Sequence, residues 1–210
     1  MTTHRLPTPA LSGALTRRAL LALAAIASAS PASGLAATAS ADQLLPLLQN
    51  SSWIADGSIG ARRVVYVFTD PNCPYCNKFW ADARPWVQAG KVQLRHVIVG
   101  ILTPESPGKA AALLGAPNPA AALASYEAGQ VEATARALAS GHPHPLSNQG
   151  LRPLAVVPAA LGARLEANAR LMQALGLQAT PAVVWRDENG ALQARTGVTP
   201  RTLNEAMGPR

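Results

Sequence analysis

The sequence predicts an α/β domain with a helical insertion, and three observations support this. A continuous β-branched and aromatic run at 64–68 is followed directly by a segment with helical character. A second apolar run and, much later, a strand-turn-strand pattern at 182–196 complete the predicted sheet. An alanine-rich stretch with helical character separates the two halves. At 210 residues and 49% hydrophobic composition, the chain can bury one core of this size.

Residues 1–41 are predicted to be a cleaved export signal. Three arginines and no acidic residue precede Asp42, the apolar run 19–29 follows Arg17-Arg18, and small residues lead to position 41. The run is shorter than the roughly 20 residues that a membrane anchor needs. The twin arginines also resemble the other bacterial export signal, although the usual aromatic residue is missing, so both routes stay open. Either route, and even an uncleaved anchor, places the thiols outside the cytoplasm.

The charge of the chain favours no nucleic-acid partner. Removing the signal takes away three of 18 basic residues and none of the 11 acidic ones, so the net charge falls from +7 to +4. The remaining basic residues form no run, and only 4% of residues are aromatic. We interpret the excess of basic residues as part of an ordinary solvated surface.

The first predicted elements surround a cysteine pair. Residues 42–60 are expected to be a short N-terminal lead-in. The run 64–68 predicts a buried central strand, and 75–89 predicts a helix that Pro85 should kink or split. Gly90 ends that helix.

The middle of the chain predicts a strand, an insertion and a further helix. Residues 92–99 alternate partly and indicate a second strand. An insertion at about 103–160 contains short helical segments punctuated by prolines, then a proline-rich connection from 141 to 158. Leucine, alanine and methionine then recur at helical spacing over 161–175.

The C-terminal part predicts a hairpin and a last helix. Residues 182–185 and 191–196 are typical of strands, and 187–190 is a turn sequence. Thr199 is suited to cap the final helix, with Pro200 in its first position.

Cys73-Pro74-Tyr75-Cys76 contains every cysteine of the chain and follows the predicted central strand. A cysteine at the start of a helix meets backbone N–H groups and the positive end of the helix dipole, which stabilise its thiolate. Two intervening residues place the second sulfur within bonding reach. The pattern predicts Cys73 as nucleophile and Cys76 as resolving thiol. Pro74 suits the first helical turn, and Tyr75 can shape the surface where a substrate docks.

Two other readings of the cysteine pair stay open. A zinc or copper dithiol site, as in a metallochaperone, uses the same spacing, but a closed zinc site would need His96, His142, His144 or carboxylates as further ligands. A static structural disulfide would close so short a loop that it would restrict the unfolded chain very little. We therefore expect no metal and no other cofactor, because the two thiols themselves exchange the electrons.

Thr180-Pro181 is the second candidate element of the site. In a cis X-Pro bond the backbone can form an unpaired edge that hydrogen-bonds an extended substrate. On the residues alone, Pro181 is simply a proline at a strand start, where prolines are tolerated.

Together these features resemble the DsbC/DsbG family of periplasmic disulfide isomerases, and within it the DsbG branch. The resemblance implies a thioredoxin-like fold over 61–210, with the helical insertion between the CxxC-bearing helix and the cis-proline strand. It also implies that Pro181 is cis and faces the cysteine pair, and that Thr180 lines the substrate groove. The likeness rests on 65–76, 79–80, 83–87, 90–95, 99–100, 104–107 and 180–182.

The resemblance also implies partners and a compartment. Relatives of this kind act in the periplasm on proteins with wrongly paired disulfides or sulfenylated cysteines, and a membrane electron donor of the DsbD type keeps them reduced. Family members carry a dimerisation domain before the catalytic domain, whereas about twenty residues precede Val64 after the predicted signal. We therefore expect a monomer rather than the family-type dimer, and a reductase or general oxidoreductase rather than an efficient isomerase.

Overall fold

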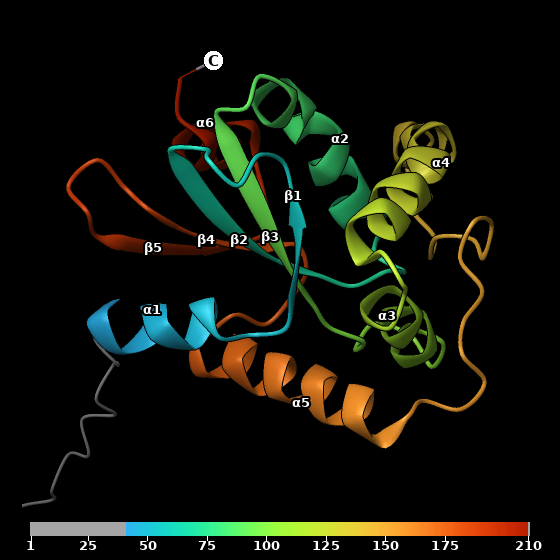
Figure 1. Ribbon diagram of the computed structural model, residues 1–210. Helices are drawn as coiled ribbons and strands as arrows, with labels where there is room; N and C mark the ends of the chain where they lie inside the picture. Colours follow the sequence, from blue (N-terminus) through green and yellow to red (C-terminus); the bar gives the residue numbers. More distant parts are fainter. Residues whose placement is uncertain (1–40, 210) are drawn as a thin grey trace, which may run out of the picture. The chain divides into compact units, whose positions relative to one another are not determined.

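A mixed sheet with strand order β1-β3-β2-β4-β5 forms the centre of the computed structural model, which describes residues 41–209 (Figure 1). The two central strands, β2 and β3, run parallel, and each edge strand pairs antiparallel with its neighbour. The order confirms the predicted α/β sheet. The strands are β1 (Trp53–Asp56), β2 (Arg63–Thr69), β3 (Val92–Ile98), β4 (Ala182–Arg186) and β5 (Leu192–Thr196).

Helices cover both faces of the sheet, with α2 and α6 on one side and α1 and α5 on the other (Figure 1). The insertion contributes α3 and α4, which pack with α5 around a cluster of their own. The bounds are α1 (Ala41–Gln49), α2 (Pro74–Gln88), α3 (Ser106–Leu114), α4 (Pro119–Ala139), α5 (Ala159–Ala174) and α6 (Pro200–Met207).

Strand β2 is buried on both faces, which explains its continuous apolar sequence. Val65 and Val67 join the core beneath α2 and α6, whereas Tyr66 and Phe68 join the core beneath α1 and α5. Successive side chains of a strand point to opposite faces, so four consecutive large residues serve two cores. The cysteine pair thus follows a strand whose last five residues are all buried.

The expectation that Pro85 would kink or split its helix is wrong in one respect, because α2 runs unbroken through it. Pro85 is exposed, so its ring lies on the solvent side, while Ala83, Trp86 and Val87 on either side of it are buried in the core. Core packing therefore holds both halves in one helix.

The predicted lead-in at 42–60 contains structure that the sequence analysis did not expect. Helix α1 places Leu48, which has no exposed surface, in the core, and β1 adds an antiparallel edge strand to β3. A four-residue strand is too short to show a periodicity, and α1 carries Pro46 inside it. The predicted export signal lies outside the described residues except for the backbone of Ala41. Within 41–209, no helix is long and apolar enough to cross a bilayer.

Candidate active site

Cys73 stands at the N-terminus of α2, just beyond the C-terminal end of β2. It is the N-cap residue, with φ −85° and ψ 111°, and its Sγ accepts a hydrogen bond from the Cys76 N–H at 3.2 Å. Pro74 occupies the first helical turn, where a missing N–H costs nothing. Both cysteines are free thiols, and each is only 2% exposed. The structure thus places the pair where the sequence predicted.

The two thiols differ in their ionisation. The hydrogen bond from the Cys76 thiol, together with its backbone N–H, lowers the pKa of Cys73. Burial raises the pKa of Cys76 well above its ordinary value, and the neighbouring Cys73 raises it further. A thiolate at Cys73 beside a protonated Cys76 is the arrangement that thiol-disulfide exchange requires of an attacking and a resolving thiol.

The Thr180–Pro181 peptide bond is cis, as the resemblance implied. Antiparallel pairing of β4 with β2 sets Ala182 opposite Phe68, and this brings Thr180 next to the cysteine pair. The Cys73 thiol donates to the Thr180 carbonyl at 3.4 Å. Within residues 41–209, the Thr180 N–H has no hydrogen-bond partner, so it is available to an incoming chain.

A groove of about 220 Å³ lies beside the cysteine pair. Tyr75, Thr180 and Pro181, three of the four predicted substrate-binding residues, line it together, and Tyr75 is 52% exposed. Pro74 is buried and does not line this groove. The sequence analysis missed the remaining lining residues, which are Lys78, Phe79, Asp82, Gly197, Val198, Thr199, Pro200 and Leu203.

A buried carboxylate, Asp70, anchors the loop that leads into Cys73. Its oxygens accept hydrogen bonds from the Asn72 N–H (2.9 Å) and the Ser106 hydroxyl (2.8 Å). They also accept from the N–H groups of Ile101 (2.7 Å) and Leu102 (2.9 Å). Because these donors come from two loops and a helix, one side chain fixes the loop after β2 to the loop after β3.

The sequence analysis did not find this polar support. Asp70 and Asn72 follow the predicted strand 64–68, and their local sequence does not show that they are buried. A usable signal lay in α3, where Ser106 and Lys109 are three residues apart and therefore share one face of an otherwise apolar helix. Both are fully buried. Polar residues repeated on the inner face of a short helix indicate a buried network.

A second buried polar contact joins α2 to the insertion. The Asn77 amide donates to the Glu127 carboxylate (2.7 Å) and to the Glu127 backbone carbonyl (2.8 Å). Glu127 is 1% exposed, and burial raises the pKa of its carboxyl group. A partly buried Asp56–Arg84 ion pair also ties β1 to α2. The catalytic helix is thus held by polar contacts on its insertion side and its β1 side.

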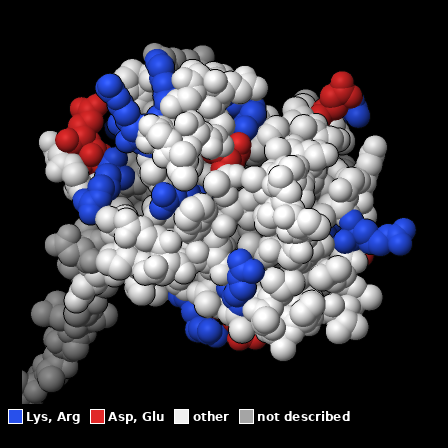
Figure 2. All heavy atoms as spheres, in the orientation of Figure 1, with Lys and Arg blue, Asp and Glu red and all other residues white. Residues whose placement is uncertain are grey.

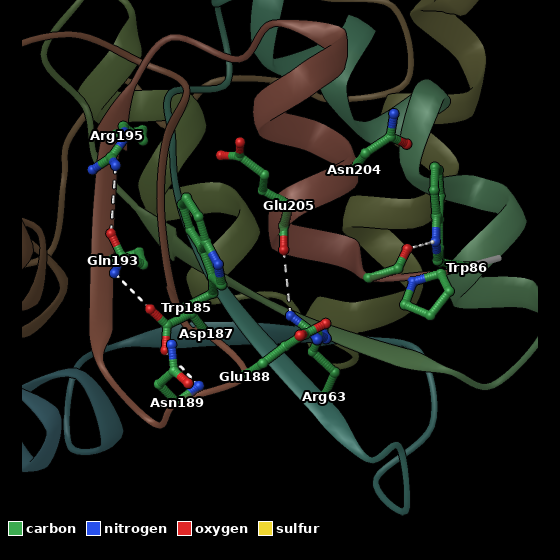
Figure 3. Close-up of a pocket in the computed structure, with 12 residues that line it drawn as sticks. Arg63, Trp86, Trp185, Asp187, Glu188, Asn189, Gln193, Arg195, Asn204 and Glu205 are labelled. Carbon is green, nitrogen blue, oxygen red and sulfur yellow. Dashed lines mark hydrogen bonds between the residues drawn. The ribbon is translucent and has the colours of Figure 1, made fainter.

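A larger cavity than this groove lies elsewhere. It measures about 600 Å³ and is formed by the β4–β5 hairpin, α6 and the first residue of β2, Arg63 (Figure 3). Cys73 follows the opposite end of β2, so this cavity takes no part in the thiol site. Charged side chains of both signs gather over the hairpin and α6 (Figure 2). Between residues 41 and 209, no group of three or more histidine, cysteine or acidic side chains is arranged to hold a metal ion.

Known sequences resemble the chain over most of its length. A family model described as a thioredoxin-like domain matches residues 58–208. The thiol:disulfide interchange protein DsbG of Pseudomonas aeruginosa is 43% identical over 171 residues, covering 81% of this chain and 60% of that protein. The protein of the same name from Escherichia coli is 39% identical over 162 residues, covering 77% and 59%. The chain spans about three fifths of the length of these curated relatives.

Solved structures show the same fold. The catalytic domain of Proteus mirabilis ScsC superposes with a TM-score of 0.53 at 20% identity, covering 78% of this chain and 92% of that one. A periplasmic thioredoxin-like protein from Salmonella enterica gives 0.55 at 18% identity, covering 79% and 97%. At these identities the likeness concerns the fold alone, and it confirms the predicted thioredoxin-like architecture.

Proposed function

Because the chain belongs to the thioredoxin-like domain family, we propose that it is an extracytoplasmic thiol-disulfide oxidoreductase with Cys73 as its nucleophile and Cys76 as its resolving thiol. One observation carries the proposal: Cys73 caps α2, accepts the Cys76 N–H at 3.2 Å and lies against the cis Thr180–Pro181 bond. The similarity to two proteins named thiol:disulfide interchange protein supports it.

The reaction consists of two exchanges at sulfur. The Cys73 thiolate attacks one sulfur of a substrate disulfide, so a Cys73–substrate disulfide forms while the other substrate sulfur leaves as a thiolate. Cys76 then loses its proton and attacks the Cys73 sulfur, which forms the Cys73–Cys76 bond and releases the second substrate thiolate. The substrate gains two electrons and the protein loses two. The raised pKa of Cys76 keeps it protonated until the first exchange is complete.

A sulfenylated cysteine fits the same sequence of steps. The Cys73 thiolate condenses with the sulfenic sulfur, hydroxide leaves as water after taking up a proton, and the same mixed disulfide results. Cys76 resolves it as before. The proposed substrates are therefore periplasmic proteins with disulfides or oxidised cysteines.

Substrate binding is proposed to use the backbone of Thr180. A carbonyl of an extended peptide beside the cis bond can accept a hydrogen bond from the Thr180 N–H. A side chain of that peptide can then lie in the groove lined by Tyr75 and Pro181. Both cysteines are almost fully buried, so we propose that docking at this groove brings a substrate sulfur to Cys73.

The wider setting belongs to the same proposal. The similarity to DsbG and the predicted export signal support the periplasm as compartment, and a DsbD-type membrane donor would return the pair to the dithiol form. We expect a monomer, and sedimentation of the purified protein tests this.

The decisive experiment traps the mixed disulfide. A Cys76→Ala variant cannot resolve the Cys73–substrate bond, so it should accumulate covalent complexes in periplasmic extracts that disappear on reduction. Non-reducing electrophoresis and mass spectrometry would identify the partners and the linked sulfur.

Cys73→Ala is the matched control, because it retains one thiol and the same fold but lacks the nucleophile. It should trap nothing. A Cys76→Ala variant that forms no complexes, or forms them as often as the control, would contradict the proposal.

A further inference from the structure

Lys109 is a cation buried within the insertion, behind the catalytic loop. Its side chain comes from α3 and has no exposed surface, whereas Lys78 and Lys91, the other lysines of the chain, are exposed. Within the described chain no carboxylate lies within ion-pair distance of it. The carboxylates of Glu105 and Asp70 attract the Lys109 ammonium electrostatically without touching it. A charge buried without a direct counterion is costly, and this cost calls for a compensating role.

Four oxygens surround the Lys109 ammonium, and one of them belongs to the residue before the nucleophile. The Nζ atom lies 2.6 Å from Asn72 Oδ1, 2.7 Å from the Leu146 carbonyl, 3.0 Å from the Ser147 carbonyl and 3.2 Å from the Tyr126 hydroxyl. The shortest contact is the one to Asn72. Lys109 therefore joins the insertion to the catalytic loop.

Asn72 is held at every polar group. Its amide donates to Thr103 Oγ1 (2.8 Å) and Ser106 Oγ (3.1 Å), and its carbonyl accepts the Leu146 N–H (3.1 Å). Its own N–H is bound to Asp70. The next residue is Cys73, whose backbone angles decide whether Sγ faces the N–H groups of α2. A rotation at Asn72 would turn that sulfur away.

Tyr126 braces the same loop from α4. Its hydroxyl donates to the Pro71 carbonyl (2.7 Å) and accepts from Lys109, so α3 and α4 both reach the residues just before Cys73. The long insertion thus contributes a polar brace behind the thiol, although none of its residues lines the substrate groove.

We propose that Lys109 is a positioning residue for the redox reaction: its ammonium fixes Asn72 so that the Cys73 sulfur stays at the N-terminus of α2. This inference rests on the proposed role of Cys73. Without the ammonium, the loop relaxes, Sγ loses its helix N–H contact, and the thiolate loses stabilisation. A less stable thiolate also favours the disulfide form of the pair over the dithiol form, which makes the protein more reducing.

The test measures the alkylation of Cys73 by iodoacetamide as a function of pH, with the modified peptide identified by mass spectrometry. Lys109→Met keeps the length of the side chain and removes its hydrogen bonds and charge. The Cys73 profile should move to higher pH, with alkylation at pH 6.5 slower by about tenfold, the factor that one pKa unit represents. In addition, the equilibrium of the Lys109→Met protein with glutathione should shift toward the Cys73–Cys76 disulfide.

Two further variants keep the test decisive. Lys91→Met removes an exposed lysine and should leave both readouts unchanged. Asn72→Ala removes the contacted side chain while the other three oxygens still hold Lys109, so it should reproduce the shift even if Lys109→Met fails to fold.

Loss of stability alone would not move the pH profile of a folded variant. A folded Lys109→Met or Asn72→Ala protein with the wild-type profile and wild-type glutathione equilibrium would overturn the inference. Failure of the proposed function would look different, because the wild-type protein itself would then show no reactive thiol at Cys73.

Discussion

At the scale of single residues, two identical side chains acquire different chemistry from their places in one helix. Cys73 precedes the first turn of α2 and receives hydrogen bonds from Cys76, while Cys76 lies one turn further along, surrounded by protein. Burial alone would raise the pKa of both thiols. The hydrogen bonds to Cys73 lower its pKa and so make the two pKa values different. Which thiol attacks is therefore decided by its position.

The first prediction concerns this difference. With the reduced protein, iodoacetamide should modify Cys73 before Cys76 at every pH below the ordinary thiol pKa of about 8.5. The Cys73 rate should reach half its maximum below that value, because hydrogen bonds from Cys76 favour the thiolate. Mass spectrometry of peptides quenched at short times gives both rates, and Cys73→Ser should leave Cys76 nearly unreactive. Equal rates at the two positions would refute the assignment.

At the scale of elements, α2 is fixed by partners on the insertion and on β1. The Asn77–Glu127 contact binds it to α4, and the Asp56–Arg84 pair binds it to β1. The Asn77 amide nitrogen contacts the Glu127 carboxyl group, whose pKa is raised by burial. The contact between α2 and α4 is therefore sensitive to pH.

The second prediction follows from the raised pKa of Glu127. The folded protein keeps the Glu127 proton to higher pH than the unfolded chain, so this group stabilises the fold below its unfolded pKa and the stabilisation is lost as pH rises through the folded value. Each pKa unit by which the folded and unfolded states differ is worth about 1.4 kcal/mol in the free energy of unfolding. The urea midpoint should fall between pH 5 and pH 8.

Glu127→Gln is the matched variant, because it keeps the acceptor for Asn77 and supplies an amide donor without a charge. Its urea midpoint should exceed that of the wild type at pH 8 and approach it at pH 5. The pKa of Asp56 is lowered in the folded protein, so its contribution makes stability rise with pH, but only in the acid range below pH 5. A variant with the same pH dependence as the wild type would show that Glu127 does not titrate there.

At the scale of the whole domain, the sheet is completed by residues far outside the cysteine motif. Strand β1 covers one edge of β3, and α1 places Leu48 in the core beneath α5. An uncovered strand edge is open to pairing with other chains. The N-terminal elements thus protect the sheet that carries the active site.

The third prediction removes these elements. A chain that begins at residue 58, where the match to the family model starts, should lose several kcal/mol of stability and aggregate, because Leu48, Ile54 and the Asp56–Arg84 pair are lost. A chain that begins at residue 41 is the control and should unfold cooperatively. Thermal unfolding and light scattering at matched concentrations distinguish them. Equal stability of the two chains would contradict the prediction.

The sequence determined the order of the elements from β2 to α6 and the place of both thiols. Those features depend on local patterns that act within a few residues: the apolar run before Cys73, the helical spacing before Gly90 and before Gly176, and the turn at 187–190. The cis bond at Pro181 followed from the family resemblance and not from the residues alone.

Only the tertiary structure decided what surrounds the thiols. Thr180 meets Cys73 because β4 pairs with β2, and Lys109 meets Asn72 because the insertion folds back onto the catalytic loop. Contacts between positions more than 30 residues apart leave no local periodicity. The spacing of Ser106 and Lys109 on one face of α3 can indicate a buried network, but it does not identify Asn72 as the partner of Lys109. The Cys73–Cys76 motif thus indicates thiol-disulfide chemistry, while packing between distant segments determines how strongly the Cys73 thiolate is stabilised.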